Sequence, residues 1–393
     1  MPTALPRFLL LFAALYLAFG VVSPFFPLFL SSRGVSAEEI GFLLSLAGLV
    51  RLVSGPLAGR IADRLHAARW VLTACCLAAS VFALSFLPAH AFSILLMIAL
   101  CHAAMLAPTT SLADALALRN ASPNGGRHGF EYGWVRGAGS AAFIIGSLAA
   151  GRVLDAYPPA SALVGQAVLL LCAAAASLVV PQIAVSPEEE QRPAQMRAVF
   201  ALLIANRPFC LLLLVAAVIL GSHAMHDSFA IIAWTRAGIG PGTGSILWSE
   251  SVAAEVIIFV LLGPWLLRRI TPVQAMTIAA CAAMLRWTVL GASSSAVALA
   301  LVEPLHGLSF ALLHLACMRI LVVVTPASLA ATAQTIYAFG IGAATALLTF
   351  ASGFLYADFG SGGFLAMAAL AAASLPLIWA LGRALRRAEF LRA

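Results

Sequence analysis

The sequence predicts an all-α membrane protein with twelve transmembrane helices, arranged as two halves of six helices each. Three observations predict this fold class. Of the 393 residues, 63% are hydrophobic and only 9% are charged, whereas a soluble domain is about 25% charged. Twelve apolar stretches are long enough to cross a bilayer, and the second half of the chain repeats features of the first. The composition therefore excludes a soluble enzyme, a disordered chain and a nucleic-acid-binding domain.

The twelve spans follow from apolar runs of about 20 residues, the length that crosses the hydrocarbon core of a bilayer. The first run, 8–31, is too long for a signal peptide and lacks a clear small-residue cleavage site. Its Pro24 and Pro27 predict a bend. The other spans are expected at residues 39–61, 70–89, 91–117, 132–154, 160–180, 208–234, 244–267, 272–291, 296–319, 329–356 and 363–382.

The longest stretch between spans, 181–207, divides the chain into an N-terminal half (1–180) and a C-terminal half (208–393). It contains Pro181, Pro187 and the acidic run Glu188–Glu190, and we interpret it as a cytoplasmic linker. No other loop is long enough for a soluble domain. No GxxxxGK[ST] phosphate loop is present, so nothing in the sequence indicates ATP hydrolysis.

The arginines predict the orientation, because loops on the cytoplasmic side carry an excess of basic residues. The net charge is +7 and every basic residue is arginine. With both termini in the cytoplasm, the outside loops hold only Arg33, Arg152 and Arg236. The inside segments hold Arg7, Arg60, Arg64, Arg69, Arg119, Arg127, Arg192, Arg197, Arg207, Arg268, Arg269, Arg319, Arg383, Arg386, Arg387 and Arg392.

The cysteines indicate neither a metal site nor a disulfide framework. All seven fall inside apolar runs without zinc-ligand spacing, and we interpret them as small buried hydrophobic residues: Cys75, Cys76, Cys101, Cys172, Cys210, Cys281 and Cys317.

A shift of 204 residues places the second predicted helix on the eighth without a gap. The shift aligns Gly34 with Gly238 and Gly59 with Gly263, and it aligns Arg51 with Glu255. It also aligns Ser31 with Thr235, Ser45 with Ser249 and Arg64 with Arg268. A parallel repeat of two six-helix halves resembles the major facilitator architecture, in which the substrate site lies at the midplane between the halves.

A loop motif carries a more specific resemblance. The segment GPLAGRIADRLHAAR (55–69) resembles the signature loop of the major facilitator superfamily, and Gly59, Asp63 and Arg64 fit its pattern. His66 stands where that family usually has glycine. In the second-half copy, GPWLLRR, Leu267 stands where the first half has the acid. The resemblance implies that Gly59, Asp63 and Arg64 form a cytoplasmic gate that latches the two halves. The alternative is a basic loop that only sets the topology.

Longer segments resemble the phenylpropionate permease (3-phenylpropionic acid transporter-like) branch of that superfamily. They are PFFPLFLSSRG (24–34), LAGLVRLVSGPL (46–57), APTTSLADALAL (107–118), EYGWVRGAGSAAF (131–143), SVAAEVIIF (251–259), LRWTVLGA (285–292) and LHGLSFALLHLACMRI (305–320). The resemblance implies a proton-coupled symporter for small organic acids, nucleosides or sugars. Asp227, Glu250 and Glu303 depart from the branch's pattern, which bears on the substrate.

Eight charged residues lie inside the predicted spans, where each costs about 2.5–3.5 kcal/mol on the insertion scale. Such groups face protein or a water-filled cavity and mark functional sites. They are Arg51, Asp114, Arg136, Asp227, Glu250, Glu255, Arg286 and Glu303.

Distances along helical hairpins predict which of these charges meet. Asp114 and Arg136 lie equally far from the centre of their connecting loop, so they can pair. The same argument places Glu255, Arg286 and Glu303 in one layer. His306 lies three residues after Glu303, on the same helix face.

These positions lead to the expected site. We expect Glu255, Glu303, His306 and Asp114 to couple protons, with Glu255 as the main acid and Arg286 close enough to set its proton affinity. An unpaired buried carboxylate favours its neutral form, so a carboxylate that ionises when an arginine or substrate arrives suits a proton symporter. Substrate contacts are expected from Arg51, Arg136, Arg286, His314, Tyr16 and Tyr337. The alternative for each is a static pair or a packing residue. Asp227 and Glu250 are interpreted as ordinary, water-exposed residues at the outer mouth.

The sequence thus predicts a secondary active transporter, with proton-coupled symport of a small organic acid as the favoured activity. The protein is expected to be a monomer in a bacterial inner membrane that needs no metal or cofactor besides the proton gradient. An exporter or facilitator of the same fold stays open as an alternative, as does a non-transporting membrane sensor. A membrane enzyme is disfavoured because no nucleophile, base or metal-ligand pattern is evident.

Overall fold

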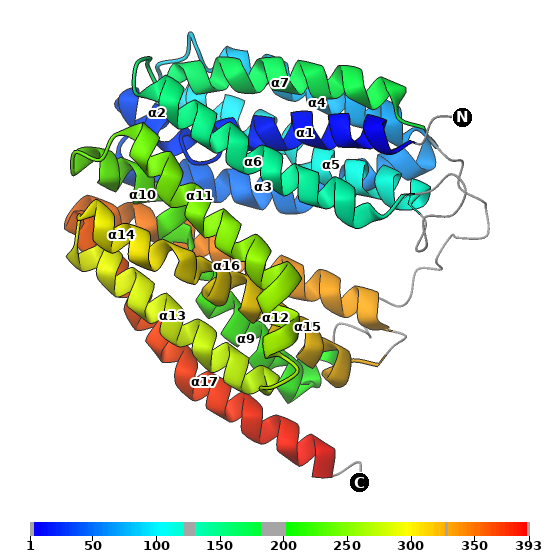
Figure 1. The fold of residues 1–393 in the computed structure, drawn as a ribbon, viewed down its shortest axis with the longest axis vertical. Helices are drawn as coiled ribbons and strands as arrows, with labels where there is room; N and C mark the ends of the chain where they lie inside the picture. Colours follow the sequence, from blue (N-terminus) through cyan, green and yellow to red (C-terminus); the bar gives the residue numbers. More distant parts are fainter. Residues whose placement is uncertain (1–3, 122–129, 182–201, 327–328, 391–393) are drawn as a thin grey trace. The chain divides into compact units, whose positions relative to one another are not determined.

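A computed structural model describes residues 4–121, 130–181, 202–326 and 329–390, and within these ranges the regular secondary structure is entirely helical (Figure 1). Eleven helical stretches in the described residues are long and apolar enough to cross a membrane. The last stretch, Ala330–Arg387, has 58 residues, far more than the roughly 20 that cross a bilayer. It breaks at Gly360, whose φ is +55°, into two helices. The chain is therefore a multi-pass integral membrane protein with the twelve predicted helices.

The N-terminal helices begin and end close to the predicted positions. The first span bends after Val22 and resumes at Phe26, as its prolines predict. Ser36 and Glu39 form a capping box that begins the second span. The helices are α1 (Leu5–Val22), α2 (Phe26–Ser32), α3 (Ala37–Arg64), α4 (Ala68–Ser85), α5 (Phe92–Asn120), α6 (Tyr132–Leu154) and α7 (Ala160–Val179).

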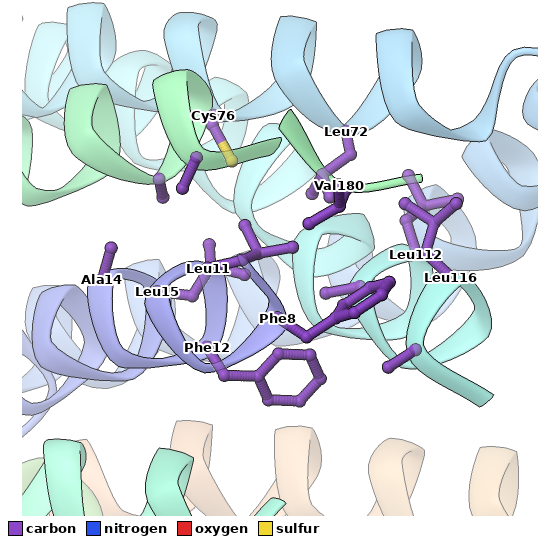
Figure 2. Close-up of a cluster of buried hydrophobic side chains, with 14 of the residues drawn as sticks. Phe8, Leu11, Phe12, Ala14, Leu15, Leu72, Cys76, Leu112, Leu116 and Val180 are labelled. Atoms are coloured by element: carbon purple, nitrogen blue, oxygen red, sulfur yellow. The ribbon is translucent and has the colours of Figure 1, made fainter. Parts of the chain in front are cut away.

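Helix α1 lies at the centre of the N-terminal core (Figure 2). Its fully buried Phe8, Leu11 and Phe12 belong to a cluster that also takes in side chains of α4, α5, α6 and α7. Small residues allow α6 to approach α1 closely: a Cβ at Gly146 would lie 2.7 Å from the backbone oxygen of Leu17. Such small-residue contacts are how helices pack in lipid, where apolar burial by itself does not drive association.

The remaining helices are less regular than the sequence indicates, because three of the spans are interrupted. The seventh span consists of α9 (Arg207–Gly221) and α10 (Ala224–Arg236). The eighth consists of α11 (Pro241–Ile257), the π-helix η2 (Ile258–Leu262) and α12 (Gly263–Leu266). The tenth consists of α14 (Ala296–Val302), the 3₁₀ turn η3 (Glu303–Leu305), the π-helix η4 (Gly307–Leu312) and α15 (Leu313–Val324).

The uninterrupted spans of this part are α13 (Pro272–Ala292), α16 (Ala330–Phe359) and α17 (Phe364–Phe390), with the 3₁₀ turn η6 (Gly360–Gly363) between the last two. Thr271 and Gln274 form a capping box at the start of α13.

The chain forms two compact units whose division differs from the predicted halves in one segment. The first unit takes in the described residues of Met1–Glu190 together with Trp234–Ser249, and the second takes in those of Gln191–Ala233 and Glu250–Ala393. The start of α11 joins the first unit because it packs against the end of α6. There, the backbone N–H of Gly242 donates to Asp155 at 2.8 Å, and a Cβ at Gly151 would overlap Ser245.

His66 gives a first testable prediction. It follows α3 with φ +49°, the left-handed conformation that glycine adopts without steric cost. Replacing the imidazole by alanine and by glycine removes the same ring contacts, but only glycine also removes the backbone strain. We expect His66→Gly to be more stable than His66→Ala by about 1–2 kcal/mol, measured by thermal unfolding in detergent. Equal stability of the two variants would contradict the strained conformation.

Candidate functional site

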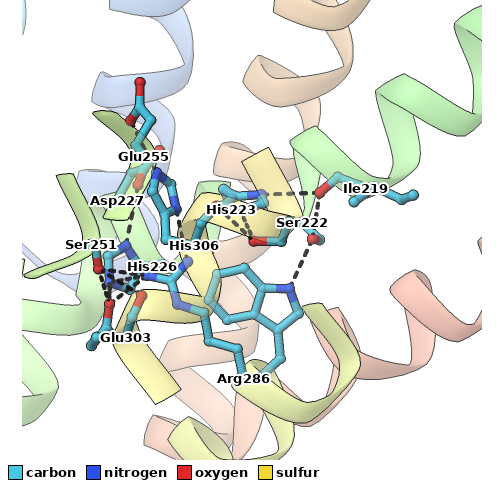
Figure 3. A network of polar contacts seen from close by, with 12 residues as sticks. Ile219, Ser222, His223, His226, Asp227, Ser251, Glu255, Arg286, Glu303 and His306 are labelled. Atoms are coloured by element: carbon cyan, nitrogen blue, oxygen red, sulfur yellow. Dashed lines mark hydrogen bonds and ion pairs between the residues drawn. The ribbon is translucent and has the colours of Figure 1, made fainter. Parts of the chain in front are cut away.

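Polar side chains from four spans of the second unit meet in one hydrogen-bonded network (Figure 3). Helices α10 and α11, helix α13 and the interrupted tenth span each contribute to it. The members of this polar network are His226, Asp227, Ser251, Glu255, Arg286, Glu303 and His306.

At its centre, Arg286 and Glu303 form a buried ion pair. Nη2 of Arg286 lies 2.6 Å from Oε2 of Glu303, and both side chains are fully buried. The hydroxyl of Ser251 donates to the same carboxylate oxygen. Loss of either partner would leave an uncompensated charge in the protein interior, which is strongly destabilising.

Arg286 also contacts two histidines, and its guanidinium can only donate hydrogen bonds. Its Nη1 donates to Nδ1 of His306 at 3.0 Å, and its Nη2 donates to Nε2 of His226 at 3.1 Å. Nδ1 of His306 therefore accepts from Arg286, whereas Nε2 of His226 lies between the guanidinium and Oε2 of Glu303, 3.4 Å away. The other ring nitrogens face further carboxylates: Nε2 of His306 lies 3.4 Å from Glu255, and Nδ1 of His226 lies 3.3 Å from Asp227.

The network thus has a buried centre and two more accessible ends. The side chains of His226 and His306 are 2% and 13% exposed, whereas those of Glu255 and Asp227 are 26% and 57% exposed. A change of charge on Glu255 can reach Arg286 through the ring of His306, which contacts both. Chemically, this arrangement can take up a proton at an accessible carboxylate and transmit the change to a buried ion pair.

The irregular tenth span places two members of the network. Helix α14 ends at Val302, and Glu303 lies in the following 3₁₀ turn, beside Pro304. A π-helix then begins at Gly307, where a Cβ would lie 2.6 Å from the backbone oxygen of Ala254. Only glycine permits this close approach to α11, the helix that carries Ser251 and Glu255. Interruptions of this kind often occur at functional sites.

Buried polar contacts surround the break between α9 and α10 in the seventh span. The indole N–H of Trp287 donates to the hydroxyl of Ser222 at 2.9 Å, and that hydroxyl donates to the carbonyl of Ile219. The ring of His223 lies between the carbonyl of Ile219 and the hydroxyl of Ser309, each 3.1 Å from one of its nitrogens. These contacts hold α10 so that His226 and Asp227 reach the network.

In the first unit, the predicted pair of Asp114 and Arg136 is wrong as an ion pair. No ion pair within 4.0 Å joins them in the described residues. Instead, the hydroxyl of Tyr132 donates to Asp114 at 2.7 Å, and the guanidinium of Arg136 lies over the ring of Tyr16, 4.9 Å from its centroid. Tyr132 lies four residues before Arg136, on the same face of α6, and its hydroxyl reaches the carboxylate while the guanidinium of Arg136 turns to Tyr16.

This arrangement predicts a coupling between Tyr132 and Asp114. We expect Tyr132→Phe to destabilise the protein by about 1.5–3 kcal/mol, the usual contribution of a hydrogen bond to a charged group. The loss should be much smaller in an Asp114→Asn background. A double-mutant cycle from thermal unfolding in detergent measures the coupling, and the matched cycle of Asp114→Asn with Arg136→Gln should give the smaller value. A larger coupling energy for Asp114 with Arg136 than for Asp114 with Tyr132 would contradict this prediction and support a direct ion pair.

The structure places the other predicted residues outside the polar network. Arg51 has an exposed side chain on α3. The ring of His314 packs edge-on against Phe259, with centroids 5.9 Å apart. Tyr337 is buried beside Cys317.

The predicted gate residues lie at the end of α3. Asp63 is within 4.0 Å of Arg119, at the end of α5, and both side chains are well exposed. A Cβ at Gly59 would meet nothing within 4 Å, so this glycine is not required by a close approach in this structure. Arg64 is exposed as well.

Sequence reasoning did not place three members of the network, His226, Asp227 and Ser251, in the expected site. His226 and Asp227 lie three and four residues after His223, the spacing of one helix face. Ser251 lies four residues before Glu255, again on one face. Such i, i+3 and i+4 polar sets inside an apolar span were the available signal.

Comparisons with known proteins agree with the fold. The model of the MFS_1 like family matches residues 5–367. The probable 3-phenylpropionic acid transporter of Escherichia coli (strain K12) is 32% identical over 367 residues, covering 91% of this chain and 92% of that protein. The maltose permease of Geobacillus stearothermophilus is 26% identical over 283 residues, covering 71% and 69%. The crystal structure of the nucleoside transporter NupG is similar with a TM-score of 0.83 at 18% identity, covering 98% and 99%.

Proposed function

Because the chain belongs to the MFS_1 like family of membrane transporters and is therefore not an enzyme, we propose that it carries a small organic acid together with protons by alternating access. The observation that carries the proposal is the chain of polar contacts from Glu255 through His306 to the buried pair of Arg286 and Glu303.

Glu255 is the residue to which we assign proton uptake and release. Its carboxylate is 26% exposed, so water can reach it without opening the core, and it lies 3.4 Å from Nε2 of His306. Protonation of Glu255 removes its negative charge and weakens the attraction between its carboxyl group and the His306 ring. Because the same ring accepts from Arg286, the protonation state of Glu255 is linked to the position of the buried guanidinium.

Glu303 has a different role in this proposal. Its carboxylate is fully buried against Arg286 and Ser251, and protonating it would leave the guanidinium uncompensated. Glu303 therefore holds Arg286 in place in this conformation. It becomes a proton site only in a conformation in which substrate or another carboxylate contacts Arg286.

The proposed substrate is an anion, because Arg136 in the first unit presents a guanidinium that can bind one. Arg136 stacks on Tyr16 and is not ion-paired within the described residues, and its side chain is exposed. An aromatic carboxylate would find a guanidinium and the edge of a phenol ring there. The name of the Escherichia coli relative, which is 32% identical, supports this substrate class.

The remaining features of the proposal concern gating and location. Gly59, Asp63 and Arg64 form a cytoplasmic gate, supported by the position of Asp63 at the exposed end of α3. Both termini are cytoplasmic, supported by the arginine distribution. The protein acts as a monomer in a bacterial inner membrane.

Uptake by proteoliposomes tests the proposal. With an acidic exterior, we expect labelled 3-phenylpropionate to accumulate inside against its gradient, and a protonophore to abolish the accumulation. Nucleosides and maltose, added in parallel, separate an organic-acid carrier from carriers of the solutes that similar proteins bear in their names. Protonophore-insensitive equilibration would indicate a facilitator, and no movement of any solute would favour a sensor; either result overturns the proposal.

A further inference from the structure

One end of the second unit carries a dense set of arginines. Three contacts bring the helix ends together there. The side chain of Arg319 donates to the carbonyl of Leu267 at 2.5 Å. That of Asn206 donates to the carbonyl of Val324 at 2.8 Å. A Cβ at Gly382 would lie 3.2 Å from Val273. The exposed arginines at this end are Arg207, Arg268, Arg269, Arg319, Arg383, Arg386 and Arg387.

The opposite end of this unit has a different character. The sequence connecting α13 to α14 and that connecting α16 to α17 contain no arginine, and Asp358 is the charged residue nearest to them. The excess of positive charge is therefore confined to one end and is not a general property of the unit's surface.

Two of these arginines stack on exposed tryptophans. The guanidinium of Arg269 lies 4.1 Å from the ring centroid of Trp265, and that of Arg383 lies 4.6 Å from that of Trp379. The tryptophans are 49% and 61% exposed. In both pairs the arginine follows the tryptophan by four residues: Arg383 lies on α17, about 6 Å further along the helix axis than Trp379, and Arg269 lies in the turn that follows the end of α12 at Leu266.

The first unit repeats the pattern with the helix direction reversed. Arg69 lies over the ring of Trp70 at 5.3 Å, at the start of α4, and Trp70 is 57% exposed. Here the arginine precedes the tryptophan, so it again lies nearer the helix end. These three pairs involve three of the four tryptophans that are exposed in the described residues, the fourth being Trp134.

We propose that the Arg–Trp pairs at these helix ends bind anionic phospholipid headgroups. Indole rings prefer the level of the membrane interface, and the guanidiniums of Arg269 and Arg383, four residues beyond their tryptophans, reach toward the level of the phosphates. Both arginines are exposed, and a guanidinium stacked on an indole can still present an N–H edge in two parallel hydrogen bonds to phosphate oxygens. The local excess of positive charge selects an anionic headgroup over a zwitterionic one.

Lipid-dependent stability tests this proposal. Phosphatidylglycerol or phosphatidylcholine of the same chain length is added to the full-length protein in detergent, and the midpoint of thermal unfolding is measured. We expect phosphatidylglycerol to raise the midpoint at least twice as much as phosphatidylcholine does. In Arg269→Gln/Arg383→Gln, this difference should fall by half or more. The matched variant Arg152→Gln/Arg236→Gln, altered at other exposed arginines, should retain it.

Native mass spectrometry gives a second readout that does not depend on unfolding. Wild-type protein should retain more phosphatidylglycerol than the Arg269→Gln/Arg383→Gln variant at the same lipid concentration. Equal stabilisation by the two lipids, or an unchanged increment in that variant, would overturn the proposal. So would the same shift with inorganic phosphate, because it would indicate an ion site and not a lipid surface.

Discussion

Glu255→Gln should abolish uphill accumulation of substrate driven by a pH gradient, while binding and exchange persist. Glutamine has the shape of a protonated glutamate but cannot release the proton, so the cycle loses the step that returns an empty, deprotonated carrier. Exchange of labelled for unlabelled substrate needs no net proton turnover. We expect at least a tenfold fall in the accumulation ratio in proteoliposomes, with counterflow close to that of the wild type.

Glu250→Gln is the matched control for this prediction. It removes the same charge from the same helix, α11, but Glu250 makes no described contact with His306 or Arg286. Accumulation should survive in this variant. If Glu255→Gln still accumulates substrate and Glu303→Gln does not, the proton site belongs to the tenth span. If both still accumulate it, this network does not couple protons.

Breaking the buried pair of Arg286 and Glu303 should have the largest effect on stability. Arg286→Met leaves the buried Glu303 carboxylate without its guanidinium partner, and Glu303→Leu leaves the buried Arg286 guanidinium without its carboxylate partner. Each should destabilise the protein by about 3–5 kcal/mol, whereas replacing both partners by apolar residues is often neutral or stabilising. The double variant Arg286→Met/Glu303→Leu should therefore recover most of the loss, measured by thermal unfolding in detergent, although transport stays absent.

The exposed pair of Asp63 and Arg119 supplies the control. Its side chains lie 4.0 Å apart and are 71% and 36% exposed, so its coupling energy should be below about 1 kcal/mol. The two double-mutant cycles use the same charge types and differ in burial. A coupling between Arg286 and Glu303 as small as that of the surface pair would show that the buried contact does not hold the spans together.

The positions of the spans could be predicted because they depend on a local property. A run of apolar residues long enough to cross the bilayer must satisfy its backbone internally, and a helix does so within the segment. The bend after Val22 followed from prolines in the same way. The layer of Glu255, Arg286 and Glu303 was also predictable, because equal distances from a tight turn place residues of antiparallel helices at equal depth.

The identity of the bonded partners within that layer was decided by the tertiary structure. Depth in the membrane alone placed Glu255 and Glu303 equally near Arg286. The 3₁₀ turn at Glu303 and the π-helix after it direct the Glu303 carboxylate toward the Arg286 guanidinium. Glu255 reaches His306 instead. A rotation of a helix by one residue moves a side chain by about 100°, and the interruptions that cause such rotations are not visible in hydropathy.

By itself, the sequence determined the membrane class, the twelve spans and the depth of the buried charges, since each of these follows from the composition and spacing along a single chain segment. Only the tertiary structure decided which charges pair, because a hydrogen bond requires two groups within about 3 Å and helix rotation and packing set that distance. Asp114 shows the difference: its depth matched Arg136, yet the side chain that reaches it is Tyr132.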